Sequence, residues 1–270
     1  MRKGEGLEGM SQEEVLRPVP HQMDTAGTVW IAPEVVYRKI SPEYREAALL
    51  FLKSALFDEL VSKRLFPKTT VNETALARGD LVLEHERAPF ILQAWEWSFS
   101  MLKAAALTIL EVAELSEKHG YHLQDAHVFN VVFFSGRPMF VDFGSFRKGQ
   151  ANSDFLRREF LRYAYIPLVL WSQGDFYIAN RLVRDHVPTR LQPFVRIDKT
   201  PFFHRYAKPF IRRRGVRCGM KTLANMMLWQ VPRLRNHLLD TSAYGKIAYD
   251  FRKMEERIRS LKVPEGKTEW

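Results

Sequence analysis

Three polar side chains in the middle of the sequence have types and a spacing that suit chemistry on a phosphate or a hydroxyl group. Asp125 precedes Asn130 by five residues, and Asp142 opens the tripeptide Asp-Phe-Gly. Carboxylate and amide oxygens are ligands that Mg²⁺ prefers, so these residue types suit a magnesium site. A carboxylate within reach of a hydroxyl group can also take its proton.

A hairpin between these residues is expected to bring them together. The residue types favour a strand over Val131–Phe134, a tight turn over Ser135–Pro138 and a returning strand over Met139–Val141. Because the second strand folds back on the first, Asn130 and Asp142 should lie at the same edge of the hairpin. All three side chains are therefore expected to face one cavity.

The elements that must position this hairpin alternate between strands and helices, which predicts the α+β class. Strand residues are rich in β-branched and aromatic types, and helical segments show apolar residues at helical spacing after a Ser or Pro start signal. The predicted elements are one or two strands over Thr28–Ile40 bending near Pro33, a helix from Ser41 to about Leu65, a strand over Asp80–Glu86, a helix over Ser98–Lys118 that stops at Gly120, and helices over Asp154–Leu170 and Asp175–Asp185.

Further candidates lie on the early strands. Arg38 and Lys39 are candidates for a cation that contacts nucleotide phosphates, and Glu84 is a third nucleotide-binding candidate. A helical carboxylate would pair with such a cation, and the candidates are Glu43, Glu46 and Glu59. Ordinary surface roles are the alternative for each of these residues. None of the loop histidines shows the spacing of a metal site; these are His119, His122 and His127.

The spacing Asp-x-x-x-x-Asn, followed by a short hairpin and an Asp, resembles the active-site core of the protein-kinase-like superfamily, especially its aminoglycoside phosphotransferase branch. Longer strings resemble the kinase-like N-terminal region of bacterial S-adenosylmethionine-dependent methyltransferases, some of which are named nodulation proteins. These strings are Val36–Arg38, Leu81–Ile91, Glu96–Leu107 and Leu123–Phe146, and the resemblance extends over roughly residues 28–197. It implies a two-lobed fold that binds Mg²⁺ and ATP and transfers a phosphoryl group to a hydroxyl acceptor. It also implies that Asp125 is the catalytic base and that Asn130 and Asp142 are the metal ligands.

Two departures from that resemblance leave other functions open. The chain has no room for a methyltransferase domain, and no glycine-rich phosphate loop precedes the strand at Val35–Ile40. One alternative is a catalytically silent accessory, or a truncated member, of the methyltransferase family that acts in surface-polysaccharide modification, with a separate methyltransferase domain or protein as its partner. A nucleic-acid-binding protein is the third candidate.

Composition limits the setting in which the protein works. The chain is 46% hydrophobic and 27% charged, which is typical of a globular protein, and its one cysteine, Cys218, cannot form an internal disulfide. The N-terminal residues show no signal sequence, and no apolar run reaches the ~20 residues of a membrane span. We therefore expect a cytoplasmic protein that is soluble or at most peripheral to a membrane.

Positive charge is concentrated near the C-terminus. The net charge is +10, and residues 199–237 hold ten Lys and Arg without one acidic residue. An anionic surface is the expected partner of this segment, with Arg212, Arg213 and Arg214 as the candidate anion-binding residues. The expected division of the chain is a mobile leader over 1–23, an N-lobe over 24–90, a C-lobe over 91–197 and a basic helical segment over 198–270.

Overall fold

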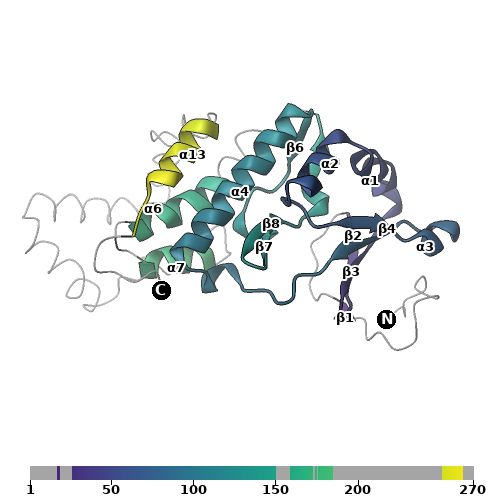
Figure 1. Ribbon diagram of the computed structural model, residues 1–270, viewed down its shortest axis with the longest axis horizontal. Helices are drawn as coiled ribbons and strands as arrows, with labels where there is room; N and C mark the ends of the chain where they lie inside the picture. Colours follow the sequence, from purple (N-terminus) through teal and green to yellow (C-terminus); the bar gives the residue numbers. More distant parts are fainter. Residues whose placement is uncertain are drawn as a thin grey trace, which may run out of the picture.

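The computed structural model describes residues 17–18, 26–149, 159–172, 174, 176–184 and 251–263. Helices and strands are mixed along these residues, as the sequence pattern predicts (Figure 1). The basic segment 199–237, with Arg212, Arg213 and Arg214, lies outside the described residues, as does the leader apart from residues 17 and 18.

A five-stranded antiparallel sheet forms one end of the described fold (Figure 1). Its strand order is β1-β2-β3-β5-β4, with bounds Arg17–Pro18, Gly27–Ile31, Val35–Ile40, Val82–Glu86 and Thr69–Val71. β2 and β3 form the two strands expected around Pro33. A Cβ atom on Gly27 would lie 1.9 Å from the carbonyl oxygen of Lys39, so this position requires glycine.

The single helix expected from Ser41 to Leu65 is wrong, because the structure divides this segment in three. A 3-10 turn, Pro42–Tyr44, precedes α1, Arg45–Leu52, and α2, Ala55–Ser62. The Ser54 hydroxyl accepts a hydrogen bond from the backbone N–H of Phe57 and so caps a new helix. A further short helix, α3 (Glu73–Ala77), was not predicted.

The long helix α4, Phe99–Lys118, supports the hairpin. Ser98 caps its first turn by accepting the N–H of Met101, and Gly120, with φ of +74°, follows its end. The buried face of α4 contacts strand β8 of the hairpin, Arg137–Phe140, and also packs on helix α13, Phe251–Ser260. Lys103 of α4 donates hydrogen bonds to the carbonyls of Arg259 and Leu261, which fixes the end of α13.

One continuous hydrophobic core joins the early helices to the later ones. It runs from Phe51 of α1 through Ile109 of α4 to Ile258 of α13. Aromatic rings fill its centre, where Phe51 stacks on Phe146 at 4.5 Å and contacts Phe143 edge-on at 5.4 Å. Because Phe143 is the middle residue of Asp-Phe-Gly, the core fixes the backbone that carries Asp142.

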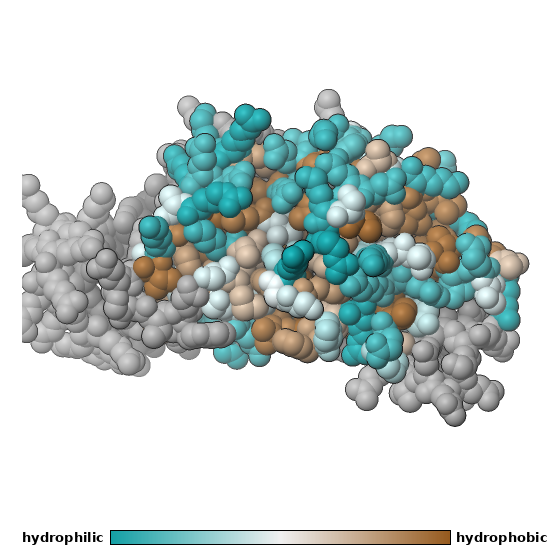
Figure 2. Space-filling model, viewed as in Figure 1, coloured by the Kyte–Doolittle hydropathy of each residue, from teal (hydrophilic) through white to brown (hydrophobic). Residues whose placement is uncertain are grey.

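The remaining helical segments lie against α4 or close to it. A π-helical turn, Leu161–Tyr165, leads into α6, Ile166–Ser172, and α7 follows over Phe176–Arg184. On the face shown in Figure 2, hydrophilic residues are interspersed with smaller hydrophobic areas. Among the described residues, no helix has both the length and the apolar character needed to cross a membrane.

Candidate functional site

The predicted hairpin is present and brings Asn130 and Asp142 together. Strands β7, Val131–Phe134, and β8, Arg137–Phe140, pair through a two-residue turn in which Ser135 and Gly136 have φ of +49° and +82°. The Asn130 amide nitrogen Nδ2 donates to Asp142 Oδ2 at 3.3 Å. The backbone N–H of Val141 donates to the Asn130 carbonyl at 2.8 Å, which extends the ladder to the residues of interest.

Asp125 is held beside this pair through its backbone. Its N–H donates to Ser145 Oγ at 2.9 Å, and the Ser145 hydroxyl donates to the Asp125 carbonyl at 3.2 Å. Asn130 Nδ2 also approaches the Asp125 carbonyl at 3.5 Å. The loop that carries Asp125 is therefore attached directly to the segment that follows Asp142.

Burial governs the electrostatics of Asp142. Removal from water raises its pKa above the ordinary aspartate value, the charge of Arg38 opposes this shift, and the charge of Asp125 adds to it. The N–H of Gly144 donates to Asp142 Oδ1 at 3.0 Å and stabilises the ionised form. Asp142 is thus a half-buried carboxylate whose pKa is influenced by a nearby cation and by a second carboxylate.

Arg38 is the one of the two cationic candidates that the structure places near Asp142. Its side chain is 6% exposed, and burial lowers its pKa to about 10 while Asp142 raises it. The guanidinium carbon lies 6.0 Å from the centre of the Phe143 ring. Arg38 therefore supplies a fixed positive charge at the edge where Asn130 and Asp142 meet.

Lys39 and Glu84 lie on the opposite face of the sheet from Arg38. Arg38 pairs with Leu83 in the register of β3 and β5, whereas Lys39 pairs with Val82 and Tyr37 with Glu84, and side chains alternate between faces along a strand. Lys39 forms an ion pair with Asp80 at 2.8 Å, and Glu84 accepts from the Asn72 amide at 2.6 Å. The structure does not bring Lys39 or Glu84 to Asp142.

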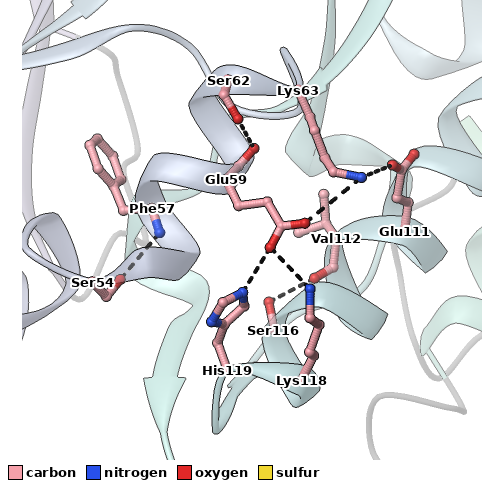
Figure 3. Close-up of polar contacts among 10 residues, drawn as sticks. All are labelled: Ser54, Phe57, Glu59, Ser62, Lys63, Glu111, Val112, Ser116, Lys118 and His119. Carbon is pink, nitrogen blue, oxygen red and sulfur yellow. Dashed lines mark hydrogen bonds and ion pairs between the residues drawn. The ribbon is translucent and has the colours of Figure 1, made fainter.

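Glu59, a candidate partner for the strand cation, lies in a different network. Its carboxylate Oε2 contacts His119 Nε2 at 2.8 Å and Lys118 Nζ at 3.4 Å, and the other oxygen lies 3.8 Å from Lys63 Nζ (Figure 3). The hydrogen bond from His119 is the main reason that the pKa of Glu59 is lowered. This network connects α2 to the end of α4. The Glu59 carboxylate therefore does not serve as the partner of Arg38. The other two candidates, Glu43 and Glu46, are both exposed.

His85 lies on the same sheet face as Arg38 and was not recognised in the sequence. It is 5% exposed, and its Nδ1 contacts the Thr69 hydroxyl at 2.8 Å. The Thr69 hydroxyl donates its only proton to the Pro67 carbonyl, so it must accept a hydrogen bond from His85. His85 Nδ1 therefore carries a proton. Burial and, to a smaller extent, the charge of Arg38 lower the pKa of His85 to about 3.

A second polar cluster adjoins Asp125 on the side of the later helices. One ligand-type atom from each of Asp125, His127 and Glu159 lies within 4.8 Å of the other two. Burial raises the pKa of Glu159 to about 7, with a further contribution from Asp125. Glu159 is 34 residues from Asp125 in the sequence. No local pattern could connect the two, and the sequence likewise placed no metal site at His127.

Comparison with known proteins gives one partial relative. No protein-family model matches the chain. The nodulation protein NoeA of Rhizobium meliloti (strain 1021) is 37% identical over 97 residues, which make up 35% of this chain and 20% of NoeA. The chain thus matches only about a fifth of the length of this curated relative.

Solved structures give a weak likeness to protein kinases. The kinase domain of PknI from Mycobacterium tuberculosis, in a point-mutant form, aligns with a TM-score of 0.39 and 13% identity over 55% of this chain and 72% of that domain. A second crystal structure of the same kinase domain also gives a TM-score of 0.39 and 13% identity, over 57% of this chain and 74% of that domain. Likeness at this level does not by itself establish a shared fold.

Proposed function

We propose that this chain is a protein-kinase-like module of two lobes that binds Mg²⁺ and ATP and transfers the γ-phosphoryl group to a hydroxyl acceptor. The observation that carries the proposal is the convergence of Asn130, Asp142 and the buried Arg38 on one edge, beside the loop that holds Asp125. The sequence spacing of the two aspartates and the asparagine matches that of the catalytic base and metal ligands in protein kinases.

The residues at this edge fit a magnesium ion by their chemistry. Two ligands at right angles around Mg²⁺, each at ~2.1 Å, lie ~3.0 Å apart. The Asn130 amide atom that faces Asp142 Oδ2 lies at 3.3 Å, and turning the amide would put its oxygen at that position. Burial has also raised the pKa of Asp142, so a cation here would stabilise its ionised form.

In the proposed reaction, the acceptor oxygen forms a bond to the γ-phosphorus while the bond from that phosphorus to the β-phosphate oxygen breaks, and ADP leaves. Asp125 takes the proton of the acceptor hydroxyl. Arg38 contributes a positive charge near the phosphates that does not depend on ion binding. Bound Mg²⁺ would supply neutralisation of the phosphate charge.

Isothermal calorimetry with Mg²⁺ and ATP tests the proposal. We expect weak binding, because no glycine-rich loop precedes β3 to hold the phosphates. Asp142→Ala should abolish binding, whereas Asp125→Ala should leave it nearly intact and remove only the transfer step. Glu43→Gln, at an exposed site, is the matched control. Binding that survives Asp142→Ala would overturn the assignment of the site.

The match to NoeA favours a second candidate function. The match reaches only part of NoeA, and in this second role the chain would act as a catalytically silent accessory to a methyltransferase in surface-polysaccharide modification. Co-purification with a methyltransferase encoded beside this chain, combined with no calorimetric signal for Mg²⁺ and ATP, would favour this role. Nucleotide binding that Asp142→Ala abolishes would favour the phosphotransferase.

A further inference from the structure

The cluster of Asp125, His127 and Glu159 has the composition of a metal site that differs from a magnesium site. Two carboxylates and an imidazole offer one nitrogen and two oxygen ligands, and their ligand atoms all lie within 4.8 Å of one another. They come from separate parts of the fold, since Asp125 and His127 lie in the loop after β6, Tyr121–Leu123, and Glu159 begins the helical segment that continues into Leu161–Tyr165.

A second observation concerns one oxygen of the Glu159 carboxylate. Glu159 Oε2 is shielded from solvent and has no hydrogen-bond partner among the described residues. The backbone N–H of Ala126 donates to this carboxylate, and the charge of Arg162 partly offsets the rise in its pKa. A carboxylate oxygen that has lost its water without gaining a donor is unfavourable, and a bound cation would satisfy it.

We propose that Asp125, His127 and Glu159 bind a divalent transition-metal ion, of which Zn²⁺ and Mn²⁺ are the representative cases. Imidazole nitrogen suits these ions, whereas Mg²⁺ favours sites made of oxygen alone. Tetrahedral ligands at ~2.1 Å from Zn²⁺ lie ~3.4 Å apart, so ligand atoms that lie up to 4.8 Å apart would approach one another by up to about 1.4 Å on binding the ion. Rotation of the Glu159 side chain can provide a movement of that size.

This site shares Asp125 with the proposed phosphotransferase site but does not need a nucleotide to form. A carboxylate bound to a transition metal is a weaker base than a free one. If the proposed function holds, an ion in this site therefore removes Asp125 from the transfer step and inhibits it. The ion-binding test below does not depend on that activity.

The test is calorimetric titration of the full chain with Zn²⁺ in excess Mg²⁺, repeated with Mn²⁺. We expect a binding event whose affinity falls at least about tenfold in His127→Gln and in Glu159→Gln, as loss of one ligand predicts. Glu114→Gln, at an exposed position on α4, and Asn130→Ala should leave it unchanged. Circular dichroism and the thermal midpoint of each variant confirm that it is folded.

Three outcomes would overturn the inference: no Zn²⁺ or Mn²⁺ binding, binding unchanged in both His127→Gln and Glu159→Gln, or binding abolished by Asn130→Ala. The last would place the ion at the Asn130 and Asp142 edge instead. Binding of Mg²⁺ and ATP is measured on the same His127→Gln protein. If His127→Gln still binds Mg²⁺ and ATP, the proposed function stands whether or not the transition-metal site exists.

Discussion

Acid should destabilise the fold through the buried histidine of the sheet. In the folded chain the pKa of His85 is lowered from 6.5 to about 3, first by burial and then by Arg38. Neutral His85 is therefore part of the folded state, and the stability that depends on it is present above pH 6.5 and lost as the pH falls toward 3. Between about pH 7 and about pH 5, the unfolded chain gains a proton that the folded chain does not, which lowers the free energy of unfolding by about 2 kcal/mol.

Urea unfolding at these two pH values measures the effect. His85→Gln removes the titrating ring, so we expect the loss of unfolding free energy on acidification to be about 2 kcal/mol smaller in this variant than in the wild-type chain. His122→Gln is the matched control, because the His122 ring contacts the Gly149 carbonyl in an exposed position. An acid-induced loss of the same size in His85→Gln and the wild-type chain would refute the reasoning.

Three further substitutions test the site and its support. Arg38→Met should weaken calorimetric binding of Mg²⁺ and ATP, whereas Lys39→Met on the opposite sheet face should not, and equal effects of the two would contradict the placement of the phosphate cation. Gly136→Ala should lower the unfolding free energy by about 1 kcal/mol in urea titrations, because φ of +82° strains any residue with a Cβ, and an unchanged midpoint would speak against the tight turn. Met254→Ala should cost about 3 kcal/mol by the same measurement, since Met254 is fully buried between α13 and α4, and a cost below about 1 kcal/mol would show that α13 does not pack there.

Local sequence signals predicted much of what surrounds the site. The strand Val131–Phe134 and the long helix ending at Lys118 match the structure, because alternation, capping and a glycine stop act over a few residues. The returning strand starts two residues earlier than expected, at Arg137, since Ser135 and Gly136 alone make the turn. The helix expected from Ser41 to Leu65 failed because the cap at Ser54 was not recognised.

Only the strand register distinguishes Arg38 from Lys39 as the candidate phosphate-contacting cation. Arg38 and Lys39 are adjacent, equally cationic and equally plausible as phosphate ligands in the sequence. The pairing of β3 with β5 puts Arg38 on the face of Leu83 and Lys39 on the face of Val82. A shift of one residue would exchange the two faces, and the observed pairing with β5 excludes that shift.

The sequence by itself determined the hairpin and the juxtaposition of Asn130 with Asp142, because a two-residue turn leaves the pairing of its strands almost no freedom. Only the tertiary structure decided the charges around that pair. The burial of Arg38 and His85 depends on packing against Phe143, and the approach of Glu159 to Asp125 depends on how a later helix meets the loop after β6. Burial and long-range proximity set these pKa shifts and ligand groupings, and both arise only when segments distant in the chain share one core.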